Sequence, residues 1–138
     1  MNINYARLCA QFTAAEVLIA GKLNPESFNT NKINNQETIN LAKKIIIEVD
    51  GNPDPNTLTP LLVEVTYNDG SSKIESICNV IGHPSNPMLR NEWINKFKHN
   101  WSLSAIKLDT NNCEKVIDSI EDLENQSSVG AIINMLVP

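Results

Sequence analysis

The sequence predicts an α+β fold, in which strands and helices occupy separate stretches of the chain. Apolar residues recur at helical spacing near both ends, alternate with polar residues in the middle, and flank an Asn-Asp-Gly turn there. Such segregation is typical of α+β folds and not of parallel α/β folds. We therefore expect an antiparallel sheet of at least three strands, preceded by an N-terminal helix and followed by a group of about three helices.

The N-terminal part begins with a helix expected over residues 4–20. Its apolar face is formed by Leu8, Phe12, Ala15 and Ile19. Gly21 suits the end of this helix, because glycine adopts the left-handed backbone without steric cost. A loop over residues 22–35 follows, with Phe28 as its expected anchor in the core, and a short helix is expected over residues 36–44.

The middle of the chain has the period of two that marks strands. Strands are expected over residues 45–50, 61–68 and 72–81. The Asn-Asp-Gly sequence predicts a hairpin turn at residues 68–71, of type I′ because Asp-Gly tolerates positive φ values.

The chain changes character at Gly82, which is followed by Pro84 and Pro87. Prolines this close together exclude a helix interior or a central strand. The next helix can therefore begin only after this segment, and Pro87 suits its first position. Later helices are expected to start at capping residues, either Thr110 or Asn111 for one and Ser127 or Ser128 for the last.

Composition and charge exclude several classes of function. The net charge of −5 argues against nucleic acid as the main partner, since phosphate binding needs a basic face. We expect no membrane span, because no stretch reaches about 18 apolar residues, and no signal peptide is visible. Three distant cysteines fit reduced, buried thiols in a cytoplasmic protein. His83 and His99 alone do not make a metal site.

The segment Gly82-His83-Pro84-Ser85-Asn86-Pro87-Met88, followed by Glu92, Lys96 and Phe97, resembles the MmgE/PrpD family. That family includes 2-methylcitrate dehydratases, cis-aconitate decarboxylases and iminodisuccinate epimerases. Other pieces follow in the family's order, namely Asn4-Tyr5-Ala6-Arg7-Leu8-Cys9, Leu41-Ala42-Lys43-Lys44-Ile45, Asp69-Gly70 and the helix over residues 117–123.

The resemblance implies that only the C-terminal portion of such an enzyme is present. Residues 1–81 would be a lid-like α+β part and residues 82–138 a C-terminal helical tail, together one compact unit. In the family, a large N-terminal helical domain supplies most catalytic groups, and the reactions remove or move a proton next to a carboxylate. No metal and no organic cofactor is implied.

The substrate-contact candidates are Tyr5, Arg7, Phe12 and His83. Family members often carry a tyrosine at the place aligned with Phe12, and a phenyl ring can neither donate a hydrogen bond nor a proton. Arg7 can pair with a substrate carboxylate through a two-pronged hydrogen bond. The plainer interpretations are an exposed helix arginine, a core phenylalanine and a structural loop histidine. No residue is a confident catalytic candidate.

The first hypothesis is therefore the lid and tail of a lyase or isomerase for small di- or tricarboxylates, inactive alone. The chain is then a split subunit with a separate helical-domain subunit as its partner, a domain of a longer enzyme, or the product of a shortened gene. The second is a free-standing, non-catalytic binding module that keeps the lid fold, so whether the chain is an enzyme stays open. A third is a structural subunit that serves dimerisation. We expect a homodimer formed largely by the C-terminal helices, because their apolar residues exceed what one small sheet can cover.

Overall fold

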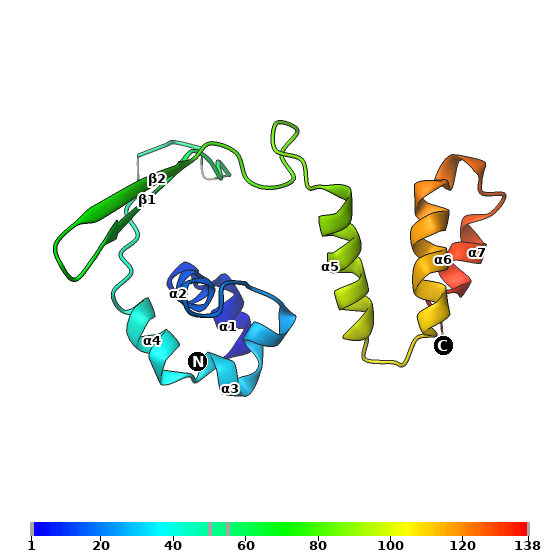
Figure 1. The fold of residues 1–138 in the computed structure, drawn as a ribbon, viewed down its shortest axis with the longest axis horizontal. Coiled ribbons are helices and arrows are strands. Elements are labelled where there is room, and N and C mark those ends of the chain that lie inside the picture. The colour runs from blue at the N-terminus through cyan, green and yellow to red at the C-terminus, as the bar shows by residue number, and fades with distance from the viewer. Residues whose placement is uncertain (1, 50, 55, 138) are drawn as a thin grey trace. The chain divides into compact units, whose positions relative to one another are not determined.

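The computed structural model describes residues 2–49, 51–54 and 56–137 and has an α+β fold with a two-stranded antiparallel sheet (Figure 1). The chain divides into two compact units, Met1–Pro55 and Asn56–Pro138. None of the described helices is both long and apolar enough to cross a bilayer. The division at residues 81 and 82, which concerns roles in an enzyme, stays a prediction.

The first unit is built from short helices. They are α1 (Ile3–Leu8), α2 (Ala10–Ala20), η1 (Pro25–Phe28), α3 (Thr30–Ile33) and α4 (Gln36–Ala42). The single helix expected over residues 4–20 is thus two helices, because Cys9 takes an extended backbone between them. Gly21 ends α2 as predicted, with a φ of 71° and its N–H bonded to the carbonyl of Val17.

Asparagine side chains start most of these helices. Those of Asn2, Asn24, Asn29 and Asn35 each accept a hydrogen bond from the backbone N–H three residues further on. Each such cap contributes about 0.5–2 kcal/mol, because it satisfies a donor that has no partner within the helix. The many asparagines of this part of the sequence therefore have a structural role.

The core of the first unit is small and centres on Phe12. Phe12 packs with Ala6 and Ile33, and Cys9 and Phe28 lie against this cluster. The rings of Phe12 and Phe28 are tilted by 46° with centroids 6.3 Å apart, a favourable aromatic arrangement. Phe28 thus packs against the core as predicted, but the loop expected over residues 22–35 contains η1 and α3.

The second unit begins with a hairpin of β1 (Leu61–Thr66) and β2 (Ser72–Ile77), paired from Leu61 opposite Ile77 to Thr66 opposite Ser72. The turn lies where the sequence predicts it, but its type differs. Within this turn only Gly70 has a positive φ, 84°, so Asp69 does not take the backbone of a type I′ turn. The N–H of Tyr67 donates to the carbonyl of Ser71, so residues 68–70 form a three-residue loop with Gly70 in the left-handed region instead.

The expected strand over residues 45–50 is not found. Residues 45–49 have no regular secondary structure, and residue 50 lies outside the described part of the chain. Ile46 and Val49 are 82% and 87% exposed. A strand needs a hydrogen-bonded neighbour, and alternation in sequence does not supply one. Within the described residues the predicted sheet of at least three strands is therefore a sheet of two.

Helices follow the hairpin, as predicted. They are α5 (Arg90–Ser102), α6 (Thr110–Glu121), η2 (Leu123–Asn125) and α7 (Val129–Asn134). α5 begins at Arg90 and not at Pro87, because the carboxylate of Glu92 accepts the N–H of Leu89 and fixes the start there. Asp109, not Thr110 or Asn111, caps α6, whereas Ser128 caps α7 as expected.

The C-terminal helices bury few residues within the described chain. Cys113, Val116, Ile117 and Ile132 are buried, and Trp93, Phe97 and Trp101 are half-buried. Lys98 pairs with Glu114 at 2.6 Å and Arg90 pairs with Glu121, so two ion pairs join α5 to α6.

The three cysteines differ in exposure, which contradicts the expectation that all are buried. Cys113 is buried, Cys9 is half-buried and Cys78 is exposed. Burial, and then the charge of Glu114, raise the pKa of the Cys113 thiol, so less of it is thiolate at neutral pH. Because thiolate is the nucleophile, we expect Cys78 to be alkylated by iodoacetamide at least about tenfold faster than Cys113. Peptide mass spectrometry over time measures both rates, and equal rates would contradict the burial of Cys113.

Candidate functional site

The arginine candidate lies on an aromatic support in the first unit. Arg7 is exposed in the last turn of α1, and its guanidinium carbon lies 5.7 Å from the ring centroid of Phe28. Phe12, which is 1% exposed, supports Phe28 from within the core. We call Arg7, Phe12 and Phe28 the Arg7 platform. An exposed cation over an aromatic face is stabilised by about 0.5–1 kcal/mol, which favours one orientation of the guanidinium.

The guanidinium of Arg7 is available for a ligand. Within the described ranges no carboxylate pairs with it. A guanidinium keeps its charge at all accessible pH values and presents its donors in a planar fork. The Arg7 platform can therefore bind a carboxylate, but it cannot take or give a proton.

Tyr5 does not join this platform. It lies two positions before Arg7 on the same helix, and residues two apart do not share a helical face. Its side chain is 62% exposed. The structure thus brings together Arg7 and Phe12, with Phe28 between them, and directs Tyr5 elsewhere.

His83 belongs to the second unit and lies in the exposed loop before α5. Its Nδ1 accepts the backbone N–H of Ser85 at 3.1 Å, which leaves the Nε2–H of the neutral ring as a donor toward solvent. Asn86 pairs with His83 in an isolated bridge and donates from Nδ2 to the carbonyl of Asn79 at 3.0 Å. His83 therefore also shapes its own loop.

The buried carboxylate of Glu16 is not predicted by the sequence analysis. Glu16 is 1% exposed, and its Oε2 accepts a hydrogen bond from the hydroxyl of Thr38 at 3.2 Å. The ammonium of Lys32 lies 3.7 Å from Oε1, which has no hydrogen-bond partner. The signal in the sequence is an acidic residue inside the apolar run 14–20. Glu16 joins α2 to α3 and α4 and has no access to a dissolved substrate.

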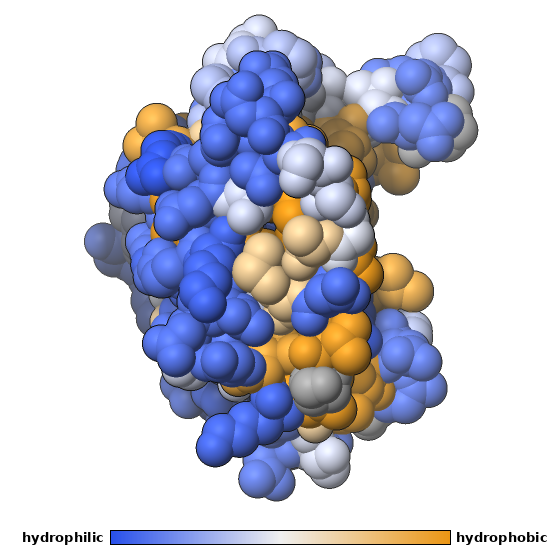
Figure 2. Space-filling model, turned by 90° about the vertical axis from the view of Figure 1, so that its right-hand side faces the viewer, coloured by the Kyte–Doolittle hydropathy of each residue, from blue (hydrophilic) through white to orange (hydrophobic). Residues whose placement is uncertain are grey.

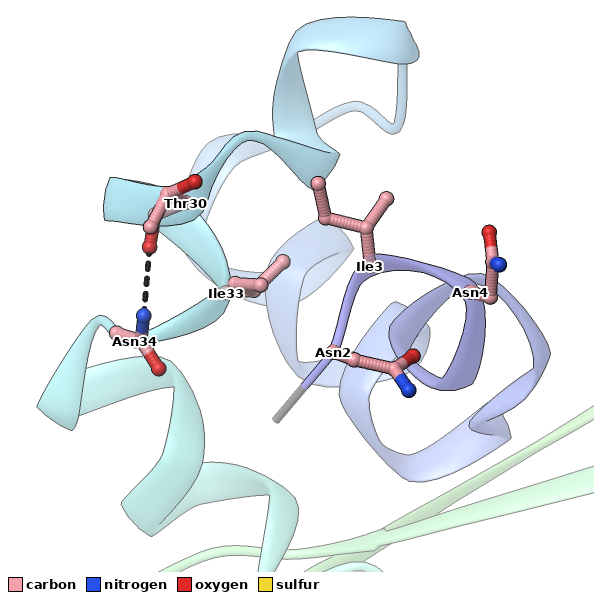
Figure 3. A pocket seen from close by; sticks show the side chains of 6 residues that line it. All are labelled: Asn2, Ile3, Asn4, Thr30, Ile33 and Asn34. Atoms are coloured by element: carbon pink, nitrogen blue, oxygen red, sulfur yellow. Dashed lines mark hydrogen bonds between the residues drawn. The ribbon is translucent and has the colours of Figure 1, made fainter.

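An open depression of about 600 Å³ lies between α1 and α3, and Figure 3 shows its lining. The lining residues are Asn2, Ile3, Asn4, Thr30, Ile33 and Asn34. Asn34 donates from Nδ2 to the carbonyl of Thr30 at 2.8 Å. The lining holds amides and apolar groups but no cation, so it suits a polycarboxylate less well than the Arg7 platform does. No group of three potential metal-binding side chains occurs among the residues described.

The comparisons with known proteins agree on one family. A sequence model of the MmgE/PrpD C-terminal domain matches residues 1–122. Cis-aconitate decarboxylase of Mus musculus is 28% identical over 124 residues, which cover 88% of this chain and 25% of that protein. The chain therefore spans a quarter of the length of the curated relative that it matches.

Proposed function

The chain belongs to the MmgE/PrpD family, and we propose that it is the lid and helical tail of a lyase or isomerase that acts on small polycarboxylates. The similarity to cis-aconitate decarboxylase supports a 2-methylcitrate dehydratase-like enzyme whose substrate is a di- or tricarboxylate. The observation that carries the proposal is the exposed guanidinium of Arg7 on the ring of Phe28, with which no carboxylate of the described residues pairs.

In this function Arg7 binds and orients one carboxylate of the substrate. Two parallel N–H···O bonds fix both the position and the plane of that carboxylate. Phe28 limits the movement of the guanidinium, and Phe12 holds Phe28 in place. Proton transfer at the neighbouring carbon falls to groups of the remaining enzyme, because an arginine does not titrate. The function needs no metal or organic cofactor.

The test of this function is assembly with the remaining enzyme. The part of mouse cis-aconitate decarboxylase outside the match, about three quarters of its length, is expressed separately and mixed with the chain. We expect one complex in size-exclusion chromatography and release of CO2 from cis-aconitate. The alternative function is a non-catalytic binding module, and a complex that forms without turnover, or no complex at all, favours it.

Within an active assembly, Arg7→Ala is expected to lower kcat/KM about 10–100-fold. A hydrogen bond to a charged group contributes about 1.5–3 kcal/mol, and 1.4 kcal/mol corresponds to a factor of ten. Arg7→Lys should recover only part of this loss, because lysine has the charge without the fork. Arg90→Ala is the matched control, since Arg90 is exposed and already paired with Glu121. An Arg7→Ala enzyme with unchanged kcat/KM contradicts the role.

The helical domain is the partner proposed for the C-terminal helices. Figure 2 shows apolar residues gathered among polar ones over part of the surface. The exposed apolar side chains of α6, α7 and the segments beside them include Ile120, Leu123, Val129, Ile133, Leu136 and Val137. Patches of this kind usually mark an interface. A homodimer through the same helices, as the sequence predicts, stays a proposal.

Two finer proposals accompany this function. The sheet gains a third strand or more in the assembled enzyme, because a hairpin alone is marginally stable in water. The location is cytoplasmic, which the three free cysteines support.

A further inference from the structure

The outer edge of β2 carries unpaired backbone groups. The described sheet holds only β1 and β2. The N–H of Tyr67 donates to the carbonyl of Ser71 at 2.8 Å, and hydrogen-bonded pairs alternate along an antiparallel ladder. Lys73 and Glu75 therefore bond toward β1, whereas the N–H and carbonyl groups of Ser72, Ile74 and Ser76 point outward. This edge is a template for another strand.

The side chains along this edge form a self-complementary pattern. Lys73 and Glu75 lie on one face, 2.8 Å apart as an ion pair, and each is 64% exposed. Ile74 stands between them on the other face, and Ser72 and Ser76 flank the three. On each side of Ile74 a charged residue comes first and a serine second. The charge is positive on the N-terminal side and negative on the C-terminal side.

We propose that β2 pairs with the β2 strand of a second copy, antiparallel about a two-fold axis through Ile74. In this register the backbone of Ile74 bonds to the backbone of the second copy's Ile74, and that of Ser72 bonds to that of the second copy's Ser76. Lys73 then lies opposite the second copy's Glu75, and this pair occurs twice. The two Lys73–Glu75 pairs occupy non-hydrogen-bonded positions of the ladder, where opposing side chains approach most closely.

Charge selects this register over its neighbours. A slip of two residues in one direction places Lys73 opposite Lys73, and a slip in the other direction places Glu75 opposite Glu75. Like charges directly opposite one another destabilise a sheet. The edge of β1 carries Glu64 but no cation, so that edge offers a second copy no ion pair. Lysine on an edge usually discourages pairing, but here the second copy supplies its partner.

The pairing leaves the apolar face of the hairpin exposed and extends it. Leu61, Val63, Val65 and Ile77 share the face of Lys73 and Glu75. A four-stranded sheet joins two such faces into one surface, and a sheet of this size is more stable than a hairpin. The inference does not depend on the proposed activity, because it concerns the strand edge alone.

The test uses charge reversal on the 138-residue chain, with mass measured by sedimentation equilibrium. We expect a dimer whose dissociation constant rises at least about tenfold in Lys73→Glu and in Glu75→Lys, since each turns two attractive pairs into repulsive ones. The double variant K73E/E75K restores the dimer. A mixture of the two single variants forms a heterodimer, because their charges are complementary. Glu64→Lys, the control on β1, leaves the dissociation constant unchanged.

Hydrogen exchange on the unmodified chain supplies a second reading. The amides of Ser72, Ile74 and Ser76 should become more protected as protein concentration rises, whereas those of Lys73 and Glu75 should change little. A monomeric mass at all concentrations overturns the proposal. So does a dimer that survives both single reversals, which would assign the contact to another surface such as the C-terminal helices.

Discussion

Replacement of Phe12 by alanine is expected to lower the free energy of unfolding of the first unit by about 3–5 kcal/mol. Phe12 is 1% exposed and centres a cluster that, among the described residues, also contains Ala6 and Ile33, with Cys9 and Phe28 at its border. A unit this small has little other apolar burial, so a loss of this size removes most of its stability.

Urea denaturation followed by circular dichroism measures this change, and the Arg7 platform supplies a second observable. Phe28 loses its support when Phe12 is truncated, so under the proposed function the binding of a carboxylate through Arg7 should weaken as well. Tyr5→Ala is the matched control, because Tyr5 is an aromatic on the same unit that is 62% exposed. Its effect should stay within about 0.5 kcal/mol. Equal effects of the two substitutions would show that Phe12 does not organise this core.

The elements that the sequence predicts correctly have local causes. Gly21 ends α2 and Ser128 caps α7 because each acts on backbone groups within a few residues. The hairpin follows from the turn at residues 68–71, where the chain must reverse. The predicted type of that turn is wrong, because within the turn only Gly70 has a positive φ. The carboxylate of Asp69 instead accepts a hydrogen bond from the N–H of Ser71 at 2.9 Å.

The elements that the sequence misses depend on distant partners. Residues 45–49 alternate like a strand, but a strand exists only where another strand bonds to it. Glu16 could not be recognised as buried, because its partner Thr38 lies 22 residues away. The sequence makes Arg7 a candidate, but its contact with the ring of Phe28 in η1 depends on the fold. The sequence therefore predicts which residue types form the candidate site, but it does not predict how they are arranged in space.

The 138-residue chain purified alone is expected neither to decarboxylate cis-aconitate nor to dehydrate 2-methylcitrate at a measurable rate. General acids and bases each contribute about 10²–10⁴-fold to such proton transfers. The Arg7 platform holds one arginine and two phenylalanines, none of which exchanges a proton at neutral pH. Tyr5 lies on another face of α1, and Glu16 is buried. In the proposed function the chain therefore binds a carboxylate, and the described residues of the Arg7 platform supply no group that reacts beside it.

Proton NMR of each substrate over a day measures this rate, with the assembled enzyme as the positive control. Turnover by the chain alone near an ordinary enzymatic rate, about 1 per second or more, would overturn the assignment of chemistry to the remaining enzyme. The Arg7→Ala chain then decides where the activity resides. If it loses the turnover, the reacting groups lie near the Arg7 platform. If it keeps the turnover, they lie elsewhere in the chain, and His83, whose Nε2–H faces solvent, is the first residue to replace.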